Sequence, residues 1–154
     1  MGVNAPRGAS TGTSSRPLAI LARLSVGQAR IAVIMAGGAI GTLARAGLAE
    51  AVPHQSGQWP WATFIVNIVG AFALGYFTTR LQERLPLSSY RRPALGTGLC
   101  GGLTTFSTMQ VEIVKMLDGH HFALAFGYAA ASLAAGYAAI QVATALARRV
   151  RVAV

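Results

Sequence analysis

The fold is decided by the stretch Gly98-Leu99-Cys100-Gly101-Gly102-Leu103-Thr104-Thr105-Phe106-Ser107-Thr108-Met109-Gln110-Val111-Glu112. It lies inside an apolar segment, yet it holds three glycines, four hydroxyl residues and an acid. Hydrocarbon offers no water to backbone groups, so such a stretch is expected only where protein or a wet cavity surrounds it. A helix broken here would expose carbonyls at one cut end and N–H groups at the other, which favours an ion site. Close packing of small residues is the simpler alternative.

The composition indicates a membrane protein. Of the 154 residues, 53% are hydrophobic and only 11% are charged, which is unusual for a soluble domain. The net charge of +9 would suit nucleic acid, but the arginines lie outside the apolar segments or at their ends. That placement favours lipid headgroups and topology signals. We therefore expect membrane lipid, and no nucleic acid, as a partner.

The apolar segments predict an all-α membrane protein with four transmembrane helices, the third broken at its centre. Residues 1–29 are rich in Gly, Ser, Thr, Ala and Arg and are predicted to form a disordered basic tail. Residues 30–148 form one transmembrane domain, and 149–154 a short C-terminal tail. The four spans are expected at residues 31–52, 61–81, 94–117 and 122–147.

The basic residues predict the orientation. Eleven of the 13 basic residues lie in the N-terminal tail, in the loop after the second span and in the C-terminal tail, or at the adjoining ends of the spans. These three regions share one side of a four-span chain. The opposite side holds Arg45 and Lys115, offset by three acids. By the positive-inside rule we expect a multi-pass protein of the inner (plasma) membrane with both termini in the cytoplasm.

Polar residues in the first two spans are candidates for function. Gly37 and Gly41 are four residues apart and predict close approach of another helix. Arg45 either extends its side chain to the headgroups or stands in an aqueous vestibule, where its charge would concentrate anions. Asn67 either holds an anion through its amide or hydrogen-bonds to a neighbouring helix.

The fourth span carries polar residues on one face. Tyr128, Ser132 and Gly136 recur every four residues in a helix otherwise made of apolar residues. The two hydroxyls indicate either a polar track or two separate interhelical hydrogen bonds. The neighbouring histidines at 120 and 121 have no evident metal-ligand partner in the sequence.

Three motifs in the first three spans resemble the Fluc (CrcB) fluoride channels. They are Gly37-Gly38-x-x-Gly41-x-x-x-Arg45, Thr63-Phe64-x-Val66-Asn67-x-x-Gly70-x-Phe72 and Gly98-x-Cys100-Gly101-Gly102-Leu103-Thr104-Thr105-Phe106-Ser107-Thr108-x-x-x-Glu112. The resemblance implies a fluoride-selective channel that exports cytoplasmic fluoride by passive electrodiffusion and so lowers its toxicity. It also implies an antiparallel dimer of the dual-topology type, with two pores and a sodium ion at the interface.

The resemblance also assigns roles to individual residues. The backbone carbonyls of Gly101 and Thr104 would bind the sodium ion, and Arg45 would stand in the vestibule. The residues that would line the fluoride pore are Asn67, Phe106, Ser107, Thr108, Met109, Tyr128 and Ser132. Such a lining suits fluoride, because compact N–H and O–H donors and the positive edge of an aromatic ring can replace its water.

The chain departs from the family pattern in two respects. Met109 stands where a second phenylalanine usually follows the first by one helical turn, and a thioether has no positive ring edge. The charge bias of the loops is also strong, whereas chains that pair with themselves in opposite orientations need nearly balanced loops. We therefore expect either a homodimer or a heterodimer with an oppositely oriented paralogue, in which one pore is degenerate.

Two rival functions remain open. A small four-helix dimeric multidrug antiporter would exchange protons through a carboxylate inside the first span, but Glu50 lies at the end of that span. A non-conducting partner subunit of a heterodimeric fluoride channel is the other alternative. A scaffold protein without transport activity would leave the third-span motif without a purpose. The sequence contains no nucleophile and base set and no cofactor loop, so we do not expect an enzyme.

Overall fold

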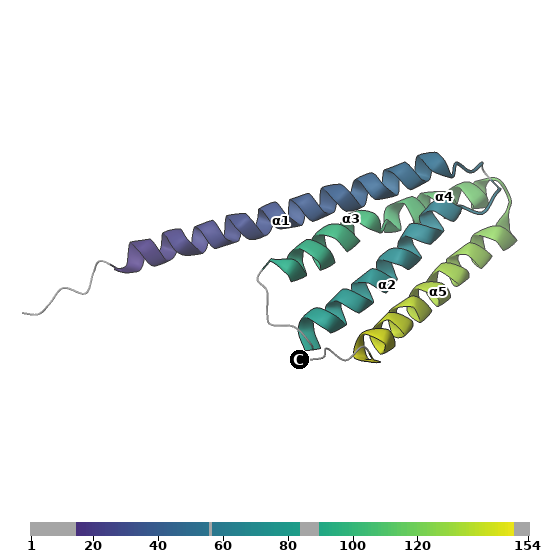
Figure 1. The fold of residues 1–154 in the computed structure, drawn as a ribbon. Coiled ribbons are helices and arrows are strands. Elements are labelled where there is room, and N and C mark those ends of the chain that lie inside the picture. Colours follow the sequence, from purple (N-terminus) through teal and green to yellow (C-terminus); the bar gives the residue numbers. More distant parts are fainter. Residues whose placement is uncertain (1–14, 56, 84–89, 150–154) are drawn as a thin grey trace, which may run out of the picture.

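The computed structural model describes residues 15–55, 57–83 and 90–149 of the chain, and its regular elements there are all helices (Figure 1). No strand occurs in these three ranges, as the apolar segments predicted. The elements are α1 (Ser15–Ala51), α2 (Trp61–Glu83), the π-helix η1 (Pro93–Cys100), the single turn α3 (Gly101–Leu103), α4 (Phe106–Asp118) and α5 (Phe122–Arg149).

Three helical stretches are long and apolar enough to cross a membrane: Gly27–Ala51, Trp61–Leu81 and Phe122–Arg149. They correspond to the first, second and fourth predicted spans. With these helices the chain is a multi-pass membrane protein. Apolar side chains on their outer surfaces remain exposed in the single chain, including Leu43 and Leu133, at 72% and 71%. Lipid or a second subunit can cover such surfaces.

The start of α1 differs from the sequence prediction. Residues 1–14 and 150–154 of the expected tails lie outside the described residues, but the chain is helical from Ser15 onward, whereas the predicted disordered tail ran to residue 29. After Pro17, which the first turn of a helix tolerates, residues 18–26 are mostly strong helix formers. Adding such residues to a helix that already exists is far easier than starting a new one.

The third apolar segment is interrupted. The helical run of η1 and α3 ends at Leu103, and α4 starts at Phe106. Between them Thr104 has φ −80° and ψ 150°, and Thr105 has φ −145° and ψ 109°, which are extended conformations. The helical pieces contain 8, 3 and 13 residues, so none of them alone has the length of a span.

Glycines bring α1 against the first half of this segment. A Cβ on Gly41 would collide with the backbone at Leu99 and Leu103, and one on Gly102 would collide with the carbonyl of Gly38. The two backbones therefore meet with no side chain between them, which confirms the close approach predicted from Gly37 and Gly41. Figure 1 shows α1 lying along α3, with its N-terminal part running past the other helices.

The second half of the segment, α4, packs against α5, and α2 packs along α5. Larger side chains fill this region. Met109, Met116, Ala125 and Tyr128 form a buried cluster, and partly buried side chains that include Trp59 pack around it. Aromatic rings cross edge to face here, as between Trp59 and Tyr128, with centroids 5.4 Å apart.

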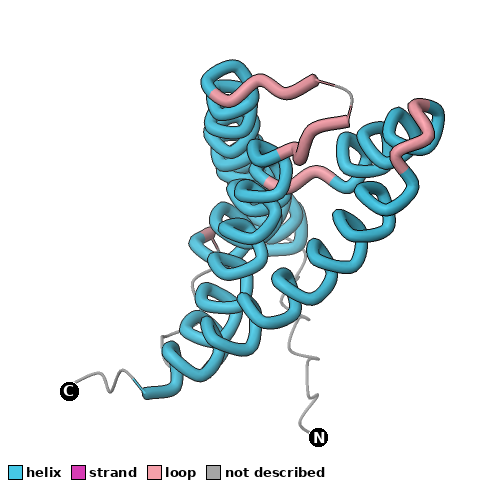
Figure 2. Tube along the Cα trace, turned by 90° about the vertical axis from the view of Figure 1, so that its right-hand side faces the viewer, coloured by secondary structure: helices cyan, strands magenta, loops and turns pink. Residues whose placement is uncertain are grey.

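The loop between α1 and α2 and the loop between α4 and α5 meet at one end of the helices (Figure 2). Gly57, with φ +90°, approaches the ring of His121 so closely that a Cβ there would lie 2.6 Å from Nε2. The positive φ favours glycine at position 57, and any larger residue would also have to displace the His121 ring.

Candidate functional site

Asn67 of α2 holds the interruption of the third segment. Its Nδ2 donates to the Thr105 carbonyl at 3.1 Å, and its Oδ1 accepts from the Thr105 N–H at 2.8 Å. One amide thus replaces, for an extended residue, the two backbone partners that a helix would supply. The sequence left open whether the Asn67 amide holds an anion or hydrogen-bonds to a neighbouring helix. Its described contacts are both with the backbone of Thr105 in the third segment. A primary amide has two N–H donors, so one remains available for a ligand.

Hydroxyl groups gather at the start of α4. Thr105 is the N-cap residue, and its Oγ1 accepts from the Thr108 N–H at 3.2 Å and donates to Thr108 Oγ1 at 2.8 Å. Ser107 Oγ lies 3.4 Å from the same Thr105 oxygen. The predicted polar residues Ser107 and Thr108 therefore do lie together, around a helix N-terminus whose backbone dipole favours an anion.

The same interruption leaves carbonyl oxygens without their helical donors. In a continuous helix the Thr105 N–H would donate to Gly101, but here it donates to Asn67. The Thr104 carbonyl leaves the helical ladder because its residue is extended. None of the described backbone hydrogen bonds in loops, turns and caps ends on either oxygen. Carbonyl oxygens are the kind of ligand that a hard cation prefers, so Gly101 and Thr104 have the donor chemistry that the predicted sodium ion would need.

Arg45 of α1 contacts the backbone of the third segment. Its Nε donates to the Gly102 carbonyl at 3.3 Å, and the side chain is half-buried. The guanidinium therefore lies beside α3, one residue from Gly101. This contact ties Arg45 to the third segment, and its place in an aqueous vestibule stays a prediction.

Glu112 belongs to the stretch and to the motif quoted above, but no role in the site was assigned to it from the sequence. The carboxylate is in fact buried, at 6% exposure. Thr63 Oγ1 donates to Oε1 at 2.5 Å, and Tyr128 Oη donates to Oε2 at 2.8 Å. Glu112 could have been proposed as a site residue from the sequence, because an ionisable residue in an apolar segment is a functional candidate by default.

Tyr128 and Ser132 lie one turn apart on α5 but in different surroundings. Tyr128 is fully buried, and its hydroxyl is used by Glu112. Ser132 Oγ is also buried, yet in the described part of the chain it has no hydrogen-bond partner. A buried hydroxyl without a partner is costly, so a ligand or a second subunit that supplies one would be favoured.

Phe106 and Met109 line one apolar groove between α4 and α5, of about 430 Å³. Phe106 is 71% exposed, whereas Met109 is 7% exposed and belongs to the buried cluster with Met116 and Tyr128. The two positions that the family resemblance pairs are therefore unequal here. The Phe106 ring is available to a ligand or a partner, whereas the Met109 thioether is buried in the apolar cluster.

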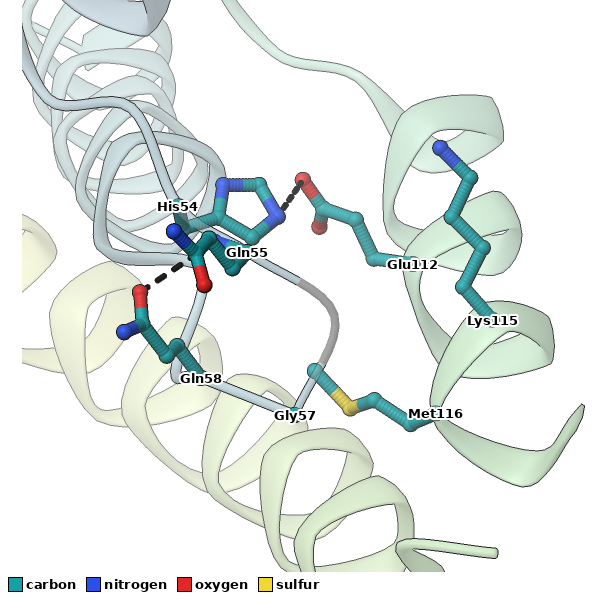
Figure 3. Close-up of a pocket in the computed structure, with 7 residues that line it drawn as sticks. All are labelled: His54, Gln55, Gly57, Gln58, Glu112, Lys115 and Met116. Carbon is teal, nitrogen blue, oxygen red and sulfur yellow. Dashed lines mark hydrogen bonds and ion pairs between the residues drawn. The ribbon is translucent and has the colours of Figure 1, made fainter. Parts of the chain in front are cut away.

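A pocket of about 120 Å³ opens where the loops meet (Figure 3). His54 and Glu112 turn toward each other across it, with Nε2 of His54 3.7 Å from Oε1 of Glu112. Lys115 and Met116 come from the same helix as Glu112. The pocket is lined by His54, Gln55, Gly57, Gln58, Glu112, Lys115 and Met116.

These features define a class of protein. It is a small helical membrane protein whose third apolar segment is interrupted, with polar groups gathered at the interruption. The family model described as "CrcB-like protein, Camphor Resistance (CrcB)" matches residues 32–144. The chain belongs to the CrcB family. The match covers the second half of α1, all of α2, η1, α3 and α4, and most of α5.

Curated relatives carry a more specific name. A protein of Mycolicibacterium paratuberculosis named "Fluoride-specific ion channel FluC 1" is 64% identical over 122 residues, which is 79% of this chain and 92% of the relative. "Fluoride-specific ion channel FluC 2" of Nocardia farcinica is 38% identical over 115 residues, 75% of this chain and 82% of the relative. "Fluoride-specific ion channel FluC" of Caulobacter vibrioides is 37% identical over 123 residues, which is 79% of this chain and 97% of the relative. These names describe ion channels and not a class of enzyme.

Proposed function

We propose that the chain is a subunit of a fluoride-selective channel that lets cytoplasmic fluoride leave the cell by passive electrodiffusion. The observation that carries this proposal is the 64% identity with a relative named as a fluoride-specific ion channel. Export would lower fluoride toxicity. The chain would act in the inner (plasma) membrane with both termini in the cytoplasm, as the charge bias predicts.

The proposed pore uses the donors around the interruption. Asn67 has one N–H left after binding Thr105, and Ser107 and Thr108 offer hydroxyls at the start of α4. Phe106 would turn its ring edge to the anion. Ser132, whose hydroxyl lacks a described partner, would continue the track. Together these groups would replace the water of a strongly hydrated ion.

Tyr128 and Met109 have weaker support as direct pore contacts. The Tyr128 hydroxyl is already used by Glu112, and Met109 is largely buried. We propose that Tyr128 closes one end of the track through that carboxylate. Met109 would border the track without coordinating the anion.

Gly101 and Thr104 would hold a structural sodium ion through their carbonyl oxygens. When bound, such an ion supplies positive charge without adding a titratable group. The residues themselves need only keep the two carbonyls out of the helical ladder, and Asn67 does this by taking the Thr105 N–H. Arg45 would attract anions toward the same region.

We infer an antiparallel dimer, because Phe106 and the groove between α4 and α5 are open in the single chain. A heterodimer with an oppositely oriented paralogue is the second possibility. The strong charge bias and the burial of Met109 favour it, and relatives carry the numbered names FluC 1 and FluC 2. In that assembly this chain could be the subunit whose own pore does not conduct.

The test is fluoride efflux from vesicles that contain the purified chain, measured with a fluoride electrode and with chloride as the control anion. Selective fluoride efflux from the chain alone would support the channel and exclude an obligate heterodimer. Efflux that appears only with a co-expressed paralogue would support the heterodimer. Absence of efflux in both preparations, or proton-coupled uptake of a cationic drug, would overturn the proposal.

A further inference from the structure

Glu112 is buried, whereas Glu50 and Asp118, the other acids whose exposure the structure describes, are exposed. Two of the contacts of Glu112, with Thr63 of α2 and Tyr128 of α5, are hydrogen bonds from neutral hydroxyls. Neither hydroxyl cancels the charge of a carboxylate. His54 is therefore the group, 3.7 Å away, whose charge determines whether the carboxylate stands alone or in an ion pair.

His54 differs from the other partners in its access to water. It lies in the loop between α1 and α2, and its side chain is 30% exposed, compared with 6% for Glu112. Protons from bulk water can therefore reach the imidazole directly. Histidine is also the side chain whose ordinary titration falls between pH 5 and 8.

The other groups that face this pocket do not change charge in the same way (Figure 3). Lys115 lines it from α4, and a lysine ordinarily keeps its charge through the range in which imidazole titrates. Gln55 and Gln58 are neutral, and a tyrosine such as Tyr128 ordinarily titrates well above that range. His121 lies against Gly57 at the rim, so a pH response that survives the substitution of His54 would point to His121.

We propose that His54 is a proton-controlled switch, which sets the net charge of this pocket and thereby the rate at which an anion passes Glu112. The inference rests on the proposed function, since it concerns one end of the same polar track. With a neutral imidazole, the carboxylate repels an approaching anion. With an imidazolium the pair is neutral overall, and Lys115 leaves the pocket positive, which attracts anions.

The sign follows from this charge balance. Fluoride flux rises as the pH falls through the range in which imidazole takes up its proton. Clefts lined by one sign of charge raise local ion concentration and entry rates by tenfold or more. For a single added charge at a half-open pocket, we expect a rise of roughly threefold between about pH 7.5 and about pH 5.5.

The experiment measures fluoride efflux from vesicles at equal pH on both sides, with the leak of protein-free vesicles subtracted at each pH. It uses whichever assembly conducts, the chain alone or with its paralogue. Three variants accompany the unmodified chain. His54→Asn keeps a neutral polar group, His54→Arg fixes the positive charge, and His120→Asn changes a histidine that does not line the pocket. Asparagine tolerates the positive φ of 59° at position 120.

We expect the unmodified chain and His120→Asn to show the threefold rise. His54→Asn should give a low flux at every pH, and His54→Arg a high flux at every pH. A flat profile in the unmodified chain would overturn the switch while leaving the channel intact, as would a pH rise that survives in both His54 variants. If no preparation conducts fluoride at any pH, the proposed function itself fails.

Discussion

The two halves of the third apolar segment are held in opposite ways. Before Thr104, η1 and α3 lie against α1 through glycines, backbone against backbone. After Thr105, α4 is held by side chains: a carboxylate with two hydroxyl donors and a cluster of large apolar residues. The first half depends on the absence of side chains, and the second depends on their chemistry.

This difference suggests that the two halves of the segment have different tasks, the first in packing and the second in responding to ions and pH. A glycine contact is close and specific in shape, and it contains no side chain that can titrate. The polar contacts of α4 can respond to ions and to pH. Asn67 stands at the boundary and fixes the extended Thr105 between the two halves. Substitutions should therefore act on folding in the first half and on both folding and transport in the second.

The largest effect is expected from Gly41→Ala in α1. The added methyl would meet the backbone of Leu99 and Leu103, which cannot rotate away. We expect a loss of about 3 kcal/mol in the free energy of unfolding. Thermal unfolding of the purified protein in detergent, followed by circular dichroism, measures it.

Gly47→Ala is the matched control on the same helix, because a Cβ there has nothing within 4 Å in the single chain. It should leave the unfolding temperature unchanged or raise it, since alanine stabilises a helix by about 0.5 to 1 kcal/mol relative to glycine. Equal losses for the two variants would contradict the glycine contact between α1 and α3.

An intermediate effect is expected from Glu112→Ala in α4. The change removes the acceptor of the buried Thr63 and Tyr128 hydroxyls, and leaving such donors unpaired costs about 2 kcal/mol. Glu112→Gln keeps an acceptor oxygen and should lose less. The same thermal measurement, repeated with Tyr128→Phe and the double variant, gives the coupling between positions 112 and 128. Strictly additive losses would mean that their hydrogen bond contributes nothing.

The smallest effect is expected from Thr105→Ala at the boundary. It removes the oxygen that accepts from the Thr108 N–H, and losing an N-cap costs about 1 kcal/mol. Hydrogen exchange at the Thr108 amide should become faster. Thr105→Ser retains the oxygen and is the control. Unchanged exchange in the alanine variant would show that the start of α4 does not depend on this cap.

Local patterns in the sequence were enough for the helical class and for the glycine approach of α1, because both depend on composition and spacing. Gly37 and Gly41 share a helix face by their separation alone. The family followed from motifs that extend through three apolar segments, and the relatives confirm it. These features need no knowledge of which helix lies beside which.

The contacts of single side chains were harder to predict, because they depend on residues far apart in the sequence. Glu112 meets Thr63 across 49 positions, and nothing local to either residue indicates the pair. The sequence left two possibilities for Asn67, since an amide serves an anion and a carbonyl equally well. Met109 was assigned to the pore by its position in a motif, whereas its burial depends on Met116 and Tyr128. The roles of these residues in conduction remain predictions.

The length of α1 also has a consequence for anything attached to the N-terminus. A helix of 37 residues is roughly 55 Å long, nearly twice the thickness of a hydrocarbon core. The part before Gly27 precedes the span itself, so it would act as a stiff spacer rather than a tether. A domain fused ahead of Ser15 would be held at a distance from the ion path, and its effective concentration there would be far lower than a flexible linker of the same length would give.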